Sequence, residues 1–153
     1  MQKRFPLDLR VLRKAAKTVL AEMTPPDTEV SISIVDDARI QELNRRYLGR
    51  DRPTNVLAFS MKEGELPFPH PQVLGDVIIS VDTARRQSNR FGLSEMETVV
   101  LLMIHGILHL LGFEHEGTKK GARQMVLKQK EFLMKSLAKE PKPPPAPPRA
   151  RIA

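Results

Sequence analysis

The chain has no cysteine among its 153 residues, so it can form neither a disulfide framework nor a thiolate metal site. Any metal ion must therefore be held by nitrogen or oxygen ligands. Long apolar runs are also missing, because the longest one, residues 99–104, is far shorter than the roughly 20 residues of a membrane-spanning helix. The first ten residues lack the apolar stretch of a secretory signal. We therefore expect a cytoplasmic protein that does not associate with a membrane.

Acidic residues are fewer than basic ones, with 18 Asp and Glu against 25 Lys and Arg, which gives a formal charge of +7. A basic surface favours polyanions such as nucleic acid or an acidic membrane, although charge alone is equally compatible with a basic protein that binds neither. The sequence has no acidic cluster of the kind that a two-metal nuclease needs. Asp76 is accordingly expected to be structural.

The length suits a single domain, which we place at residues 1–138. Residues 139–153 differ in composition, because six of the eight residues from 141 to 148 are proline. Proline in that density prevents both helix and sheet. We expect a disordered, basic tail there.

Hydrophobic periodicity and helix-capping residues divide the domain into alternating helices and strands. A second helix is expected to begin after Asp36 and Asp37, to turn Ile40 and Tyr47 inward, and to end at Gly49. Ser94 and Glu97 form a Ser-x-x-Glu capping box at the start of a helix that is apolar nearly all round. The expected helices span residues 8–23, 37–48, 82–91, 94–111 and 118–137, and the expected strands span 30–34, 54–60 and 75–80. The pattern predicts an α+β fold, with a small mixed β-sheet packed against a buried central helix that carries a metal motif, and with other helices around it.

Three of the four histidines, His105, His109 and His115, fall within eleven residues. His105 and His109 are four residues apart, which places both rings on one face of a helix. Gly112 can adopt the left-handed conformation that ends the helix and lets the chain bring His115 back. Three imidazoles around one ion leave a fourth position open to water, as catalytic zinc sites require. The alternative is three unrelated histidines on a buried helix.

One position separates this motif from that of the metalloproteases. In them a glutamate follows the first histidine and acts as the general base in peptide hydrolysis. Here that position is Gly106, and Glu114 and Glu116 lie beyond the chain reversal. Peptide hydrolysis is therefore the weaker interpretation of the site.

Three blocks together resemble the YbeY family of bacterial endoribonucleases, also called rRNA maturation factors. They are HGILHLLGFEH at 105–115, LNRRYLGRDRPTNVLAFS at 43–60 and GDVIIS at 75–80, and the resemblance covers roughly residues 30–135. It implies a metal-dependent endoribonuclease that is specific for single-stranded RNA and acts on the 3′ end of 16S rRNA and in ribosome quality control. It also implies that His105, His109 and His115 bind one zinc ion. The implied partners are the rRNA precursor and the small ribosomal subunit with its assembly factors.

The chain departs from this family at two places. Leu48 stands where the family often has an arginine implicated in activity, and Phe113-Glu114 stands where it usually has Tyr-Asp. The first departure leaves open which cation contacts the scissile phosphate.

Five nearby residues are candidates for binding RNA. Cations can stabilise the charge that develops on a phosphodiester during cleavage, and RNA carries its own nucleophile in the 2′-OH. Asn55 could hydrogen-bond RNA or only shape the turn that follows Pro53. The candidates are Arg45, Arg46, Arg50, Arg52 and Asn55.

Two other functions stay open at this point. One is a metallohydrolase of another class, such as a peptidase, which the histidine spacing permits. The other is a non-catalytic ribosome-assembly factor in which the metal only fixes the fold. The general acid and base of the reaction cannot be assigned from the sequence.

Overall fold

The computed structural model of the chain describes residues 7–61, 72–113 and 119–137. These residues form a three-stranded sheet in the order β1-β3-β2, in which β1 is parallel and β2 antiparallel to β3. The sheet is therefore mixed, and the α+β prediction is confirmed. The elements in chain order are α1 (Leu9–Met23), β1 (Glu29–Val35), α2 (Asp37–Leu48), β2 (Val56–Ser60), β3 (Val73–Ser80), α3 (Val81–Phe91), α4 (Glu95–Leu110) and α5 (Lys119–Leu137).

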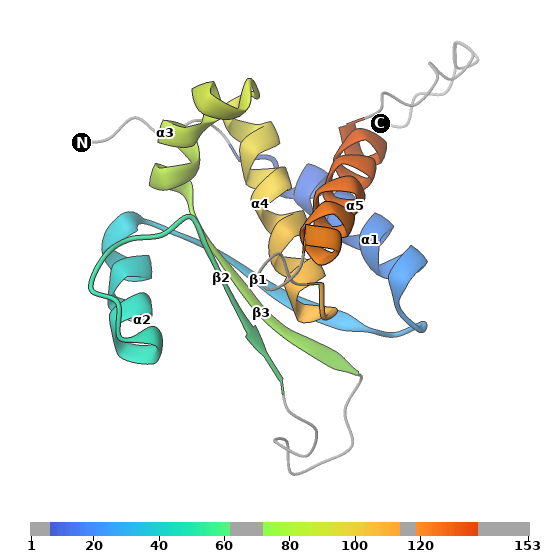
Figure 1. Cartoon of the computed structure of the whole chain (residues 1–153), viewed down its shortest axis with the longest axis horizontal. Coiled ribbons are helices and arrows are strands. Elements are labelled where there is room, and N and C mark those ends of the chain that lie inside the picture. The colour runs from blue at the N-terminus through green and yellow to red at the C-terminus, as the bar shows by residue number, and fades with distance from the viewer. Residues whose placement is uncertain (1–6, 62–71, 114–118, 138–153) are drawn as a thin grey trace, which may run out of the picture.

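Helix α4 lies between the sheet and the helices α1 and α5, whereas α2 covers the opposite side of the sheet (Figure 1). This helix supplies Ile104, Ile107 and Leu108 to the main core, where they meet Val77 of β3 and Phe132 of α5. All five side chains are fully buried. Burial of a side chain of this size contributes about 1.5–3 kcal/mol, so this layer dominates the stability of the fold. A second, smaller core beneath α2 consists of Ile40, Leu43 and Leu57.

The helix ends follow the expected capping chemistry. Asp36 accepts a hydrogen bond from the backbone of Arg39 at the start of α2. Ser94 and Glu97 form a complete capping box at the start of α4, with hydrogen bonds of 3.0 and 2.9 Å. Gly49 ends α2 in the left-handed conformation, with φ at 69°. These caps confirm the predicted boundaries of both helices to within one residue.

No single helix in the described ranges is long and apolar enough to cross a membrane. Helices α3 and α4 pass that test of length and composition only as a pair, and the chain bends by 104° between them.

One sequence prediction about packing is wrong. Tyr47 was expected to face inward from α2, but 58% of its surface is exposed. The reason is its position at the rim of the sheet. Its ring lies 5.4 Å from the ring of Phe59 on β2, which is an edge strand in the described part of the sheet. No further described strand lies beyond Phe59 to cover the Tyr47 ring.

Candidate active site

A cleft of about 550 Å³ opens between α4, β2 and the segment of residues 49–55 that joins α2 to β2. Both described histidines of the predicted metal motif lie in its wall. The residues that line it are Asn44, Leu48, Arg50, Arg52, Thr54, Asn55, Val56, Leu57, Ala58, Ser60, His105, Gly106, His109 and Leu110.

His105 and His109 lie one turn apart near the C-terminal end of α4. Their ring centroids are 4.7 Å apart, with the ring planes at 71°. The helix ends as predicted, because Gly112 has φ at 95° and the Phe113 N–H donates to the carbonyl of Leu108 at 3.0 Å. The described residues contain no group of three or more histidine or acidic side chains able to hold a metal ion. The third predicted ligand, His115, lies outside the described residues, so the full tripod stays a prediction.

Gln129 on α5 fixes the orientation of His105. The Nδ1 atom of His105 lies 2.7 Å from the Oε1 atom of Gln129. A carbonyl oxygen can only accept, so this contact favours the tautomer with the proton on Nδ1, in which a neutral ring has its lone pair on Nε2. Metal-binding histidines usually donate their second N–H in this way, which fixes the tautomer that binds the ion. The donor set therefore fits a zinc ion.

Gly106 is packed too tightly against the sheet to carry a side chain. A Cβ atom at this position would lie 2.6 Å from a methyl group of Val77 and 3.3 Å from one of Val56. Both contacts are closer than normal van der Waals separation. The glycine lets α4 approach the sheet and brings its backbone to the wall of the cleft. A glutamate base of the metalloprotease kind has no space here, so the structure gives a steric reason for its absence.

Two carboxamide groups hold the arginine-bearing segment against α2. The buried side chain of Asn44 donates to the carbonyl of Arg52 at 2.9 Å. Gln41 donates to the carboxylate of Asp51 at 3.1 Å. These bonds tie the segment to a regular helix, and Arg50 and Arg52 both line the cleft.

Asn55 also lines the cleft and joins it to α3. Its side-chain nitrogen donates to the side-chain oxygen of Gln87 at 3.1 Å, and its backbone carbonyl accepts from the backbone N–H of Ser80 at 2.9 Å. The residue therefore shapes the turn before β2 and also faces the cleft. Leu48, which stands where the family often has arginine, lies in the same wall.

Arg45 and Arg46 are not among the residues that line the cleft. Both are exposed on the last turns of α2. The guanidinium carbon of Arg46 lies 5.7 Å from the centre of the Tyr47 ring. The structure thus separates the four arginine candidates into a pair in the cleft and a pair beside it.

A carboxylate network fixes the junction of β3 and α3 that Asn55 contacts. Asp37 accepts hydrogen bonds from the hydroxyls of Ser80 and Thr83, each at 2.6 Å, and pairs with Arg86 at 2.7 Å. Burial alone would raise the pKa of Asp37. The hydrogen bonds from Ser80, Thr83 and Arg86 outweigh that effect, so the pKa lies below its usual value.

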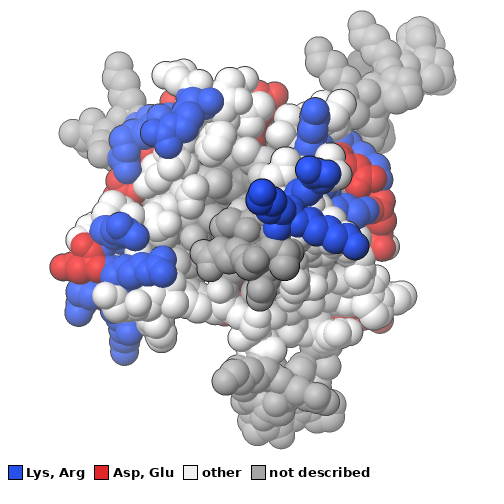
Figure 2. All heavy atoms as spheres, in the orientation of Figure 1, with Lys and Arg blue, Asp and Glu red and all other residues white. Residues whose placement is uncertain are grey.

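Basic side chains gather on the face seen in Figure 2, over α2 on one side and over α5 on the other. The exposed basic residues of the chain include Arg50 and Arg52 before β2 and Lys119, Lys120 and Arg123 at the start of α5. Such a distribution attracts polyanions.

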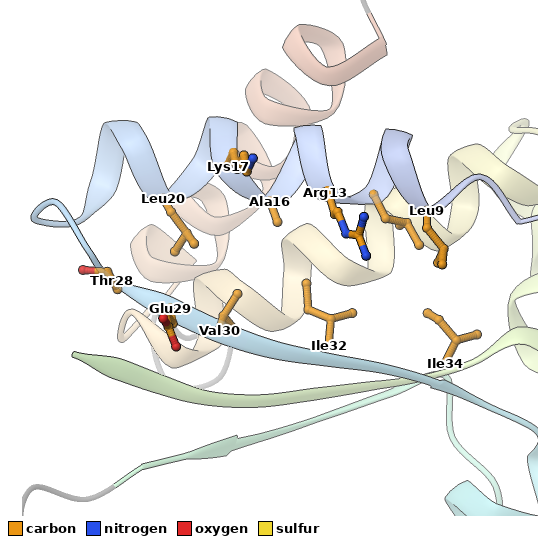
Figure 3. Close-up of a pocket in the computed structure, with 11 residues that line it drawn as sticks. Leu9, Arg13, Ala16, Lys17, Leu20, Thr28, Glu29, Val30, Ile32 and Ile34 are labelled. Atoms are coloured by element: carbon orange, nitrogen blue, oxygen red, sulfur yellow. The ribbon is translucent and has the colours of Figure 1, made fainter. Parts of the chain in front are cut away.

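A second hollow, of about 500 Å³, lies between α1 and β1. Its wall is made mainly of apolar side chains such as Leu20, Val30 and Ile32, with Arg13 and Lys17 on the helix above them (Figure 3). Those apolar side chains pack against the main core. This hollow contains no histidine, so the chemistry belongs to the first cleft.

An α+β domain with paired histidines and arginines in one cleft has the features of a single-metal hydrolase that acts on an anionic substrate. The family model for endoribonuclease YbeY matches residues 2–137. The chain therefore belongs to the endoribonuclease YbeY family.

Individual relatives agree with this assignment. The endoribonucleases YbeY of Geobacter sulfurreducens and Syntrophotalea carbinolica are each 46% identical to this chain over 132 residues, covering 86% of it and 88% of the relative. That of Geobacillus thermodenitrificans is 43% identical over 130 residues and 81% of both chains. The solution structure of TM1509 from Thermotoga maritima resembles the fold, with a TM-score of 0.60, 25% identity and coverage of 87% of this chain and 85% of that one.

The sequence prediction missed two residues that orient the site, Asn44 and Gln129. Both are amides on the apolar stripe of a helix, since Asn44 follows buried Ile40 by four residues and Gln129 follows buried Met125 by four. A carboxamide among inward-facing apolar positions was the available signal, because a buried amide needs a hydrogen-bond partner.

Proposed function

We propose that this chain cleaves single-stranded RNA in the cleft between α4 and β2, using one zinc ion held by His105, His109 and His115. As a member of its family it is a metal-dependent endoribonuclease, a hydrolase of RNA phosphodiester bonds that acts in rRNA processing. The observation that carries the proposal is that two histidines and two arginines line the same cleft.

The side chains in the cleft have separable roles. His105 and His109 present imidazole nitrogens on one helix face, and Gln129 holds the first ring in the metal-binding tautomer. A zinc ion bound there would act as a Lewis acid toward a phosphoryl oxygen. Arg50 and Arg52 neutralise the phosphate charge, which grows in the transition state. Their anchoring to α2 reduces the reorganisation needed when RNA binds.

The size of the cleft supports a single-stranded substrate. A volume of about 550 Å³ is in the range of small-molecule sites and suits a nucleotide or two, whereas a duplex would have to open first. Residues 49–60, which form one wall, present arginine, asparagine and threonine side chains that can contact the sugar-phosphate backbone.

The cellular role that we propose is maturation of the 3′ end of 16S rRNA and ribosome quality control in the cytoplasm. The partners would then be the rRNA precursor and the small ribosomal subunit with its assembly factors. The basic side chains over α2 and over α5 support this role, because ribosomal substrates are polyanions (Figure 2).

The proposal is tested by measuring metal content and RNA cleavage together. Wild-type protein freed of contaminating nucleases should contain about one zinc per chain and should cut single-stranded RNA in preference to a duplex. His109→Ala should lose both properties. Gln124→Ala, an exposed residue on α5 outside the cleft, is the matched control and should keep both.

Three results would each contradict a different part of the proposal. RNA cleavage that persists in metal-free His109→Ala would show that the histidine site takes no part in the reaction. Metal-loaded protein that binds rRNA precursor without cutting it would indicate an assembly factor with a structural metal. Chelator-sensitive hydrolysis of peptides, without RNA cleavage, would indicate the peptidase class.

A further inference from the structure

Tyr47 is an aromatic side chain exposed at the surface beside the edge strand β2. Its ring packs against Phe59 at a tilt of 59°, with 5.4 Å between ring centroids. The guanidinium of Arg46 lies 5.7 Å from the Tyr47 ring centre. Even with these two neighbours, 58% of the residue remains accessible. The ring is thus supported by Phe59 from the sheet side and still presents a large apolar surface to solvent.

Tyr47 adjoins the candidate active site on α2. Leu48 directly follows it and Asn44 lies one helical turn before it, and both line the cleft. Ser60, which directly follows Phe59 on the edge strand β2, lines the cleft as well, whereas Phe59 packs with the smaller core beneath α2 on the other face of the sheet. A strand of RNA that leaves the cleft over the edge of β2 toward α2 would therefore pass Tyr47.

We propose that Tyr47, supported by Phe59 and Arg46, is a stacking platform for a base of the RNA strand that extends out of the cleft. Single-stranded RNA is commonly held by aromatic rings and arginine planes that stack on bases, while cations contact the backbone. The platform supplies the ring and the guanidinium, and Arg50 and Arg52 supply cations for the neighbouring phosphates. This inference rests on the proposed function, since it assumes that RNA occupies the cleft.

The charge around Tyr47 favours RNA over an apolar protein partner. Four arginines lie within six residues of Tyr47 in the sequence, and all four are exposed. An apolar protein partner that covered this ring would bury or displace these guanidinium groups without compensating charges, which is unfavourable. A polyanion neutralises them. Stacking is also tolerant of sequence, because every base presents a π-face, so the platform would hold RNA without selecting a particular base.

The protein offers a direct reporter for this contact, because Tyr47 is its only tyrosine and it has no tryptophan. Its intrinsic tyrosine emission therefore comes from Tyr47 alone. The metal-loaded full chain should be titrated with an oligoadenylate of about ten nucleotides that carries 2′-O-methyl riboses, which keeps bases and phosphates but blocks the 2′-OH nucleophile. The Tyr47 emission, corrected for the absorbance of the RNA, should fall as RNA binds, because a stacked base quenches the ring.

Variants then measure the contribution of the ring to binding, using anisotropy of the same RNA carrying a dye. Tyr47→Ala should weaken binding by about 5- to 150-fold, the range found when stacking residues are replaced by alanine. Tyr47→Phe keeps the stacking surface and should bind within about 2-fold of wild type. Phe91→Ala, which removes another exposed ring at the end of α3, is the matched control and should leave affinity unchanged.

The two readouts separate this inference from the proposed function. If anisotropy shows RNA binding while the corrected Tyr47 emission is constant, the platform is disproved and the endoribonuclease proposal stands. If the loss in Tyr47→Ala persists on RNA whose bases have been removed, the ring does not act by stacking and the platform is again disproved. If anisotropy shows no RNA binding by wild-type protein, both proposals fail. Quenching of the corrected Tyr47 emission together with the loss in Tyr47→Ala establishes the platform.

Discussion

The first three turns of α4 and its last turn and a half differ in what surrounds them. From Thr98 to Ile104 nearly every side chain is buried between the sheet, α1 and α5. From His105 to Leu110 one face of the helix opens into the cleft, and the side chains that line the cleft there are His105, His109 and Leu110. One continuous helix thus passes from the core into the candidate active site.

Gly106 lies where these two regions meet and belongs to both. Its missing side chain permits the contact of α4 with Val77 and Val56, and its backbone lines the cleft. The difference between the regions shows that packing selects residues by volume in the first part of α4, whereas chemistry selects them in the last. Substitutions that disturb packing should therefore lower the unfolding free energy, whereas substitutions that disturb the histidines should lower metal affinity.

The largest effect is expected from Gly106→Glu, which would place a carboxylate against the apolar side of the sheet. The added Cβ would already overlap Val77, and the charge would be buried without a partner, so we expect a loss of more than about 4 kcal/mol of unfolding free energy. Gly106→Ala should cost about 1–3 kcal/mol through overpacking alone. Urea denaturation monitored by circular dichroism measures both.

The double variant Gly106→Ala/Val77→Ala tests the cause of this loss. Removing the valine methyl groups should relieve the overlap, so the double variant should be more stable than the sum of the two single losses implies. Strict additivity would show that the contact between position 106 and β3 is not responsible.

The next largest effect should fall on metal binding and leave the fold intact. Gln129→Leu removes the acceptor for His105 Nδ1–H, so zinc affinity should fall about 10- to 100-fold while the urea midpoint changes little. Competition with a chromophoric chelator measures the affinity. Gln124→Leu makes the same chemical change at an exposed position on α5 and should leave affinity unchanged. Equal zinc affinities in the two variants would show that Gln129 does not orient His105 for metal binding.

A smaller effect, confined to acid pH, is expected at Asp37. Its pKa is lowered in the folded protein, so its ionised form stabilises the fold above the unfolded pKa of about 3.9, and this contribution is lost as pH falls through the lower folded pKa. Asp37→Asn should cost about 1–2 kcal/mol at neutral pH and should lack this component of the pH dependence. Urea midpoints of both proteins from pH 7 to about 2.5 test this. Parallel curves would show that Asp37 does not contribute to acid unfolding.

The smallest effect is expected at the surface contact between α1 and α5. Glu22 pairs with Lys135 at 2.6 Å and with Lys128 at 3.5 Å, and the hydrogen bond from Lys135 is the main cause of its lowered pKa. These groups are exposed to solvent and screened by salt, so Glu22→Gln should leave the urea midpoint unchanged within error at physiological salt. A clear shift would mean that this pair holds α1 to α5 more strongly than exposed pairs normally do.

Most of the fold was predictable because local signals agreed with one another. The capping box of Ser94 and Glu97 and the terminating Gly49 fix helix ends through bonds within a few residues, and those ends agree with the prediction to within one residue. The near-continuous apolar surface of α4 indicated a central helix because such a surface can only be buried.

The sequence could not give the features that depend on contacts between distant segments. Tyr47 has the spacing of an inward residue, but its exposure depends on β2 being an edge strand. The division of the arginine candidates into Arg50 and Arg52 in the cleft and Arg45 and Arg46 beside it follows from the path of the chain after Gly49. The roles of His115 and of the tail at 139–153 stay predictions, because both lie outside the described residues.

The direction of α4 has an electrostatic consequence for the cleft. The helix begins at its capping box, next to α3, and ends at His109 and Leu110, so its carboxyl end carries a partial negative charge of about half an electron beside the histidines. That end of the cleft attracts cations, whereas the wall formed by Arg50 and Arg52 attracts anions. In the proposed function, a phosphate bound between the two walls would meet the arginines on one wall and the histidine-bound metal on the other. Reversing the helix would place a partial positive charge beside the histidines and weaken their binding of a cation.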